Sequence, residues 1–181
     1  MSDWPYPAPV DCGGARHLTP DTEIPDVALP STSGGETSIA RAPGLSIVFV
    51  YTWTGRPGLA NPPDWDSIPG AHGSTPEAEG FRDLYAEYRA QGAEIFGLSS
   101  QDQSHQQEFA ARAKLPYALL SDQGQLFRRA LALPVFETGG GAYLKRLTLV
   151  ARDGRLVRVF YPVHPPDKHA GEVLSWLRAE S

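Results

Sequence analysis

The stretch LSIVFVYT, residues 45–52, decides the fold class of this chain. Its β-branched and apolar side chains cover both faces of an extended segment, which is typical of a strand at the centre of a sheet. A loop rich in proline and glycine follows over residues 53–73, and a loop of this length in a compact domain is usually functional. From Thr75 the apolar residues repeat at helical spacing until Gly92. The stretch therefore predicts a central strand that leads through a functional loop into an amphipathic helix.

Strands and helices alternate along the rest of the chain. Before residue 45 we expect a short strand, a Gly-Gly turn and a second short segment. After residue 92 the patterns predict a buried strand (93–100), a polar helix (100–115), a short strand (117–122), a short helix (125–133), a hairpin of two alternating strands (143–161) and a last helix (167–180). Strands separated by helices imply parallel crossovers, and the hairpin adds an antiparallel edge. The expected fold is a thioredoxin-like α/β sandwich with a central mixed sheet and flanking helices.

The N-terminal region differs in composition from the rest. Residues 1–24 are rich in proline and show little periodicity, so we expect an extended lead-in that Trp4 and Tyr6 hold in place. Residues 25–181 are expected to form a single domain, because no internal repeat or linker divides them.

Composition excludes several classes of function. The net charge of −5 leaves no basic excess for nucleic acid or an anionic membrane surface. No apolar run approaches the length of a membrane span, and the N-terminus does not resemble a signal peptide. The single cysteine, Cys12, cannot form an internal disulfide or a thiolate metal cluster. These observations predict a cytoplasmic protein without nucleic-acid or membrane partners.

The start of the predicted helix is the place where chemistry is expected. Free backbone N–H groups at a helix N-terminus favour an anion, and they lower the pKa of a cysteine placed there. Ser74 occupies this position. A purely structural reading is also available, because Ser74 and Glu77 match the S-x-x-E capping box and Pro76 suits the first turn.

Several motifs resemble the bacterioferritin-comigratory-like branch of the peroxiredoxins. GSTPEAEGFRD (73–83) is similar to the GCTPQSCAFRD type of active-site signature of that branch, with serine in place of the first cysteine. IFGLSSQDQSHQQEFAARAKLPYALLSD (95–122), YTWTGRPG (51–58) and YLKRLTLV (143–150) resemble other segments of the branch in the same order. The resemblance extends over residues 20–178.

The resemblance implies a reaction and roles for individual residues. In this family a cysteine attacks a peroxide and becomes a sulfenic acid, which a second thiol resolves. Ser74 lies at the peroxidatic position, Arg146 at the position of an arginine that lowers the thiolate pKa and orients the peroxide, and Glu79 where some members carry a resolving cysteine. The implied partners are a peroxide and a thioredoxin-like reductant, with the protein as a monomer or homodimer. No cofactor, flavin or metal is implied.

The chain departs from the family pattern at the site itself. Ser74 offers no thiolate, and oxygen cannot follow the sulfenic-acid chemistry. Thr52 replaces a proline of the family pattern, and Ala71 replaces a threonine or serine. Thr54 is expected to supply the hydroxyl that Ala71 lacks. Glu79 is expected to place a negative charge near the site, which disfavours a thiolate. The expected function is therefore a peroxidase scaffold that is inactive through residue 74, whether serine was engineered or arose naturally. The alternative is a non-catalytic protein that binds a partner or small ligand in the old pocket.

Three other features have more than one interpretation. Cys12 is expected to be incidental, because no helix start near it would activate the thiol; a redox role through an intermolecular disulfide is the alternative. A serine hydrolase built from Ser74 and His72 is disfavoured, since there is no G-x-S-x-G motif and no evident acid partner. Trp53 and Trp65 are expected to form either a lid over the site or a partner surface.

Overall fold

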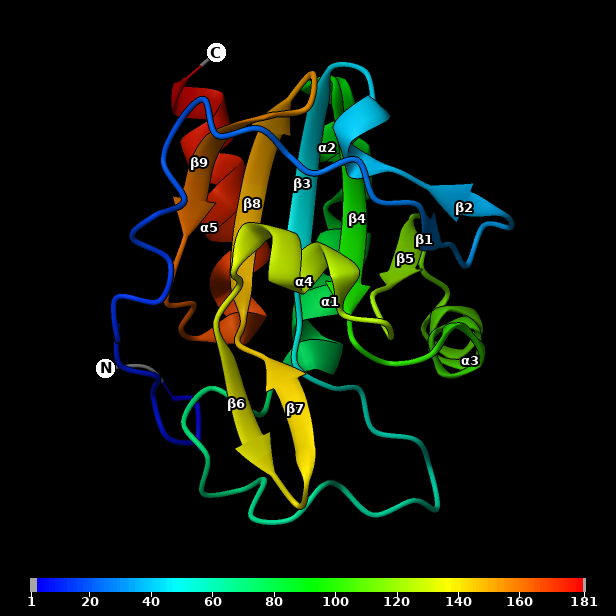
Figure 1. The fold of residues 1–181 in the computed structure, drawn as a ribbon, viewed down its shortest axis with the longest axis vertical. Helices are drawn as coiled ribbons and strands as arrows, with labels where there is room; N and C mark the ends of the chain where they lie inside the picture. The colour runs from blue at the N-terminus through cyan, green and yellow to red at the C-terminus, as the bar shows by residue number, and fades with distance from the viewer. Residues whose placement is uncertain (1–2, 181) are drawn as a thin grey trace.

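The computed structural model describes residues 3–180, so the first two residues of the expected lead-in and the last residue of the expected domain lie outside the described residues. Five strands form the central sheet in the order β5-β4-β3-β8-β9 (Figure 1). β3, β4 and β5 are parallel, whereas β8 and β9 run antiparallel to their neighbours. Their bounds are β3 Leu45–Val50, β4 Ala93–Ser99, β5 Ala118–Ser121, β8 Leu147–Arg152 and β9 Arg155–Phe160.

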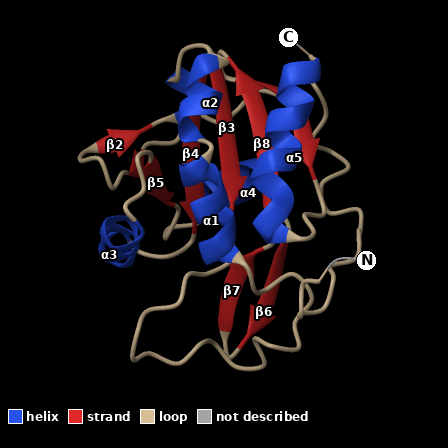
Figure 2. Ribbon diagram, turned by 180° about the vertical axis from the view of Figure 1, so that it is seen from behind, coloured by secondary structure: helices blue, strands red, loops and turns tan. Residues whose placement is uncertain are grey.

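Helices cover both faces of this sheet. One face carries α1 (Ser74–Asp83), α2 (Tyr85–Ala90) and α5 (Pro166–Ala179), which lie in front of the sheet in Figure 2. The short helix α4 (Leu126–Leu131) lies on the opposite face, in front of the sheet in Figure 1. α3 (Gln103–Ala113) packs beside β5 at one edge. The arrangement is the predicted α/β sandwich.

The core explains why the stretch at residues 45–52 forms the central strand. All six residues of β3 are buried. Ile47 and Phe49 pack into the hydrophobic cluster under α1 and α5, while Val48 and Val50 pack into the cluster under α4. A continuous apolar run is what a strand buried on both faces requires.

Smaller elements extend from the sandwich. β1 (Leu29–Pro30) pairs with β2 (Glu36–Thr37), and a 3₁₀ turn follows at Ile39–Arg41. β6 (Val135–Thr138) and β7 (Gly141–Leu144) form a hairpin that projects beyond the sheet (Figure 1). The N-terminal segment passes along the outer edge of β9, where Glu23 forms an isolated bridge with Arg155.

The structure corrects the predicted hairpin at residues 143–161. The hairpin itself is present, but its first strand begins at Leu147 because Leu144 ends β7, which pairs with β6. The β6–β7 hairpin was not predicted, because its glycine-rich turn interrupts the apolar pattern. β8 does not alternate either: five of its six residues are buried, since it lies between β3 and β9 under helices on both faces.

The predicted helix after the long loop is likewise divided. It breaks at Leu84 into α1 and α2, although its inward stripe is retained: Phe81 and Tyr88 are fully buried. Across residues 3–180, every helix is too short or too polar to span a lipid bilayer.

Candidate active site

Ser74 is the first residue of α1 and follows the long loop that leaves the carboxyl end of β3. The helix can start here because Gly73, its N-cap, has a left-handed φ of 117°. A Cβ at residue 73 would overlap the ring of Pro166 at the start of α5, with its Cβ only 2.8 Å away. Glycine therefore allows α1 to begin against α5, which fixes the position of Ser74.

The hydroxyl of Ser74 is buried and has three polar partners. The residue is 3% exposed. Its Oγ accepts from Nη2 of Arg146 at 3.1 Å and from the backbone N–H of Trp53 at 3.4 Å. Thr52 donates its own hydroxyl proton to the Ala71 carbonyl at 2.7 Å, so the Ser74 hydroxyl donates to Thr52 Oγ1, 3.2 Å away. Two N–H donors thus converge on the oxygen of residue 74.

Arg146 connects this hydroxyl to a buried carboxylate. It lies in the link between β7 and β8, is 4% exposed, and donates through Nη1 to Glu77 in a short ion pair. Glu77 is fully buried. Nη2 of Arg146 faces four oxygens, of Thr52, Ala71, His72 and Ser74, at 3.1–3.3 Å. Positive charge is therefore held directly against residue 74.

Burial and charge act against each other at Glu77. Burial raises the pKa of the Glu77 carboxyl, because the anion loses its hydration. The Arg146 guanidinium, and more weakly His169, oppose that rise. Glu77 Oε1 and Arg146 Nε are buried without a hydrogen-bond partner in the structure. The negative charge of Glu77 is therefore stabilised mainly by its contact with Arg146.

The capping-box interpretation of Ser74 and Glu77 is wrong. Gly73, not Ser74, is the N-cap, and no side chain caps α1. Ser74 instead bonds across to Thr52 and Arg146, and Glu77 turns inward to Arg146. Residues three apart share one helix face, and this spacing is the signal by which Glu77 could have been added to the candidate site.

The other candidate residues lie apart from this contact set. The Thr54 hydroxyl donates to Gln101 Oε1 at 3.0 Å, and the threonine hydroxyl that reaches Ser74 is that of Thr52. The Glu79 side chain is 43% exposed and faces Arg82, at 3.8 Å. The negative charge in the site is that of Glu77.

His72 has an acid partner that the sequence did not reveal. Its Nε2 lies 2.6 Å from Asp66 Oδ1, and its ring stacks on Tyr6 with centroids 3.7 Å apart. No hydrogen bond joins His72 to the hydroxyl of Ser74 among the described residues, where that hydroxyl bonds to Thr52, Trp53 and Arg146. The histidine therefore holds the N-terminal segment on the loop, and no hydrolase triad is assembled.

The two loop tryptophans pack inward. Trp65 is buried against Phe136 and Tyr143 of the β6–β7 hairpin. Trp53 contacts Tyr143 and His105. They anchor the loop to the hairpin and to α3, and Trp65 is too deeply buried to form a partner surface.

The environment of Cys12 also differs from the expectation. Its thiol is exposed but lies 3.1 Å from the Tyr161 hydroxyl and 3.5 Å from Lys145 Nζ. The hydrogen bond from Tyr161, together with the Gly14 backbone and Lys145, lowers the pKa of Cys12 to about 7. The sequence could not indicate this, because both side chains come from distant segments.

The geometry at residue 74 is suited to a negatively charged atom. A guanidinium and a backbone N–H converge on one buried side-chain position at a helix N-terminus. A thiolate there would be stabilised, whereas a serine hydroxyl remains protonated near neutral pH. Within residues 3–180 no cluster of three or more His, Cys, Asp or Glu residues could hold a metal ion.

Comparisons with known proteins agree with this geometry. The model of the Redoxin family matches residues 19–174. Peroxiredoxin Q of Suaeda salsa, a chloroplastic protein, is 32% identical over 177 residues, covering 96% of this chain and 74% of the relative. Peroxiredoxin Q of Oryza sativa subsp. japonica is 29% identical over 199 residues, covering 97% and 89%. The crystal structure of peroxidoxin BcpB from Mycobacterium tuberculosis superposes with a TM-score of 0.73 at 25% identity, covering 91% of this chain and 99% of that one, which confirms the thioredoxin-like fold.

The relatives also correct the expected compartment. The names of the curated peroxiredoxin Q relatives place those proteins in the chloroplast, so the prediction of a cytoplasmic protein is wrong. It rested on the single cysteine and on an N-terminus that does not resemble a signal peptide, and neither observation identifies a compartment.

The ordered motifs, the mixed five-stranded sheet and the family match over residues 19–174 lead to one assignment. The chain belongs to the redoxin family and, within it, to the bacterioferritin-comigratory-like peroxiredoxin Q branch of the peroxiredoxins.

Proposed function

We propose that this chain carries a peroxiredoxin active-site scaffold in which Ser74 stands at the peroxidatic position, so that no peroxide is reduced at this residue. The peroxiredoxin scaffold follows from the family assignment. What the proposal adds is the place of the missing thiol and the consequence of its absence.

One observation carries the proposal. The Oγ of Ser74 accepts from both Arg146 and the Trp53 backbone, in a buried position at the start of α1. Donors that converge on one atom in a site shielded from water stabilise negative charge there far more than in solution. Such an arrangement suits a thiolate, and it gives a neutral hydroxyl little benefit.

Arg146 and Glu77 have distinct roles in this proposal. Arg146 stabilises the anion at residue 74 and orients the peroxide, as its family position implies. Glu77 is a positioning residue, because its buried carboxylate holds Nη1 of Arg146 and leaves Nη2 facing Ser74. Thr52 fixes the Ser74 hydroxyl from the other side.

Serine at this position removes the chemistry and keeps the scaffold. The sulfur of a thiolate accepts an oxygen atom from a peroxide and becomes a sulfenic acid, a step that an alcohol oxygen does not undergo. Glu79 lies at the position of the local resolving cysteine, so this chain lacks that thiol too. Peroxiredoxins act on peroxides with thioredoxin-like reductants, and a thiol restored at residue 74 would need such a reductant.

The alternative is that the old pocket binds a partner or small ligand without catalysis. The two proposals differ in whether the site still stabilises a thiolate. We would introduce a thiol with Ser74→Cys in a Cys12→Ser background and measure its pKa from the ultraviolet absorbance of the thiolate. The matched control is Leu59→Cys in the same background, because Leu59 lies exposed in the loop.

We expect the thiol at residue 74 to have a pKa at least about one unit below that at residue 59. An equal or higher pKa at residue 74 would mean that burial outweighs the donors. The scaffold proposal would then be rejected in favour of the binding alternative.

A further inference from the structure

The start of the long loop is held by a buried polar cluster that takes no part in the chemistry proposed for residue 74. Its centre is Thr54, which is 1% exposed. The two side chains that hold it are those of Gln101, in the turn between β4 and α3, and His105, in the first turn of α3. These three residues, the Thr54 cluster, tie the loop to one edge of the sandwich.

Every hydrogen-bonding group of Thr54 is satisfied within this cluster. Gln101 Oε1 accepts from the Thr54 N–H at 2.9 Å and from its hydroxyl at 3.0 Å. Gln101 Nε2 donates to the Thr54 carbonyl at 3.2 Å, and His105 Nε2 donates to the same carbonyl at 2.8 Å. His105 therefore carries a proton on Nε2, because a carbonyl oxygen only accepts. One glutamine amide thus pairs with both backbone groups of Thr54, as a neighbouring strand would.

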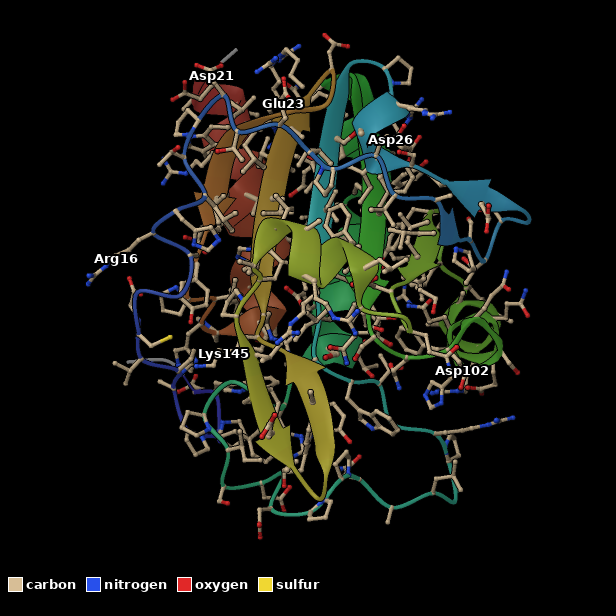
Figure 3. The ribbon with its side chains drawn as sticks, in the orientation of Figure 1. Arg16, Asp21, Glu23, Asp26, Asp102 and Lys145 are labelled. Carbon is tan, nitrogen blue, oxygen red and sulfur yellow. The ribbon has the colours of Figure 1, made fainter. Side chains whose placement is uncertain are left out.

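The two side chains that hold Thr54 are fixed in turn by the sheet and by α3. Ser121, at the end of β5, donates to the Gln101 carbonyl at 2.6 Å, and the Gln101 N–H donates to Ser99 Oγ at 3.2 Å. Asp102, the N-cap of α3, accepts from the His105 N–H at 2.8 Å. Asp102 lies at the start of α3, on the side where the long loop passes (Figure 3). The sheet and the helix therefore set the position of the loop.

Trp53 lies between the Thr54 cluster and Ser74. Its N–H donates to Ser74 Oγ at 3.4 Å, a distance at which a hydrogen bond is too weak to hold the chain by itself. The preceding residue, Thr52, is fixed through its hydroxyl to the Ala71 carbonyl at 2.7 Å, and the following residue is held by the cluster. Because peptide units are planar, fixing both neighbours leaves the Trp53 N–H little freedom. Its direction is set from outside the site.

His105 also restrains the side chain of Trp53. The centroids of the two rings lie 5.2 Å apart, and Tyr143 packs edge-on against the same indole at 6.1 Å. His105 thus contacts the indole of Trp53 and the carbonyl of the next residue at once. Replacing His105 should therefore move the Trp53 N–H.

We propose that Gln101 and His105 are positioning residues, which hold the start of the loop so that the Trp53 N–H faces the side-chain atom of residue 74. The inference rests on the proposed function, in which this N–H and Arg146 Nη2 are the two donors to an anion at that atom. Arg146 reaches the site from the β7–β8 link, where its ion pair holds it. Loss of the Thr54 cluster should therefore remove one donor and leave the other.

The test compares thiol pKa values within one background, Ser74→Cys with Cys12→Ser, from the ultraviolet absorbance of the thiolate. His105→Leu removes the donor to the loop carbonyl, whereas His105→Gln keeps a donor of similar reach. Gln101→Met removes the paired amide. Should Gln101→Met fail to fold, the two His105 variants decide the question, because they leave that amide in place.

A matched control separates positioning from a general loss of stability. Tyr88→Phe removes a buried hydrogen bond of 2.7 Å to the Ala170 carbonyl, between α2 and α5. It lowers the stability of the core without touching the start of the loop. The four variants are each compared with the same parent thiol at residue 74.

We expect the pKa of the thiol at residue 74 to rise by about one unit in His105→Leu and in Gln101→Met, because one hydrogen bond to the anion is lost. This is a tenfold fall in the ionisation constant. His105→Gln should raise the pKa less, and Tyr88→Phe should leave it unchanged. An unchanged pKa in His105→Leu, or an equal rise in Tyr88→Phe, would overturn the inference.

The chain with Ser74 gives a second readout that needs no thiol. Amide hydrogen exchange of Trp53, followed by NMR, should become about tenfold faster in His105→Leu and stay unchanged in Tyr88→Phe. Equal acceleration in both variants would show that His105 only stabilises the fold, which contradicts the positioning role.

This inference and the scaffold proposal fail separately. Each variant is compared with its own parent, so a rise in pKa counts whatever the pKa of the parent thiol. A parent pKa no lower than that of the Leu59→Cys control rejects the scaffold proposal. A pKa that stays the same across the parent, His105→Leu and Gln101→Met rejects the positioning roles.

Discussion

The buried ion pair of Glu77 and Arg146 predicts that removing either partner destabilises the fold, but with a different pH dependence for each partner. Removing one partner of a buried ion pair destabilises a protein by about 3–5 kcal/mol, because an unpaired charge is left in the interior. An arginine cannot release its proton, so Glu77→Met should cost about that much at any pH between 5 and 7. A carboxyl can instead take up a proton, so in Arg146→Met the unpaired charge can be removed by protonation of Glu77.

The free energy of protonating Glu77 sets an upper limit on the charge-related cost of Arg146→Met. Neutralising Glu77 costs about 1.4 kcal/mol for each pH unit above its reference pKa of 4.5. The charge-related cost is then at most about 3.4 kcal/mol at pH 7 and about 0.7 kcal/mol at pH 5. The sign follows from linkage: burial already raises the pKa of Glu77 in the intact chain, and loss of the opposing Arg146 guanidinium raises it further. The folded variant therefore binds more protons than the folded intact chain, and the cost of the substitution grows as pH rises.

Urea unfolding, followed by tryptophan fluorescence at pH 7 and pH 5, measures these costs relative to the unmodified chain. Arg146→Met should regain at most about 2.7 kcal/mol at pH 5, whereas Glu77→Met should regain little. The double variant should lose less than the sum of the single ones. Equal pH dependence of the two single variants, or a smaller cost for Glu77→Met at pH 5, would refute the reasoning.

Three further substitutions test the packing that positions the site, each by the change in urea midpoint. Gly73→Ala should destabilise by about 3 kcal/mol through its left-handed φ and overlap with Pro166; a loss below about 1 kcal/mol would mean that α1 can start elsewhere. Gly97→Ala places a Cβ 2.5 Å from Leu119 in the sheet, and we expect a cost of about 1–3 kcal/mol; an unchanged midpoint would contradict the close packing of β4 on β5. Asp122→Ala removes the carboxylate that accepts two N–H groups of α4, at an expected cost of about 1–2 kcal/mol; no loss would show that water replaces it.

The fold was largely predictable because its strongest signals are local. The apolar run of β3 and the helical stripe through Phe81 and Tyr88 each report burial directly, and the structure confirms both. The β6–β7 hairpin escaped prediction because its glycine-rich turn interrupts the apolar pattern, and because its aromatic residues Phe136 and Tyr143 pack on Trp65 of the loop. A pattern that depends on a distant loop cannot be read from its own segment.

The candidate site was predicted only in part, because some of its contacts join segments that are distant in the sequence. Ser74 and Arg146 were chosen from motif positions, and the structure places their side chains 3.1 Å apart. Glu77 and Thr52 were given other interpretations, because their contacts depend on how β3, α1 and the β7–β8 link converge. The surroundings of Cys12 could not be predicted either, because Tyr161 and Lys145 come from distant segments.

The most direct test of the central claim is peroxide consumption by the chain with Ser74→Cys beside the chain with Ser74, both in a Cys12→Ser background. Rapid mixing with limiting hydrogen peroxide gives the rate of the first turnover. We predict that the serine form is inert and that the cysteine form reacts about 100-fold faster than the exposed Leu59→Cys control, because the donors at residue 74 are already in place. A cysteine form no faster than that control would contradict the claim that residue 74 stands in an intact peroxidatic site.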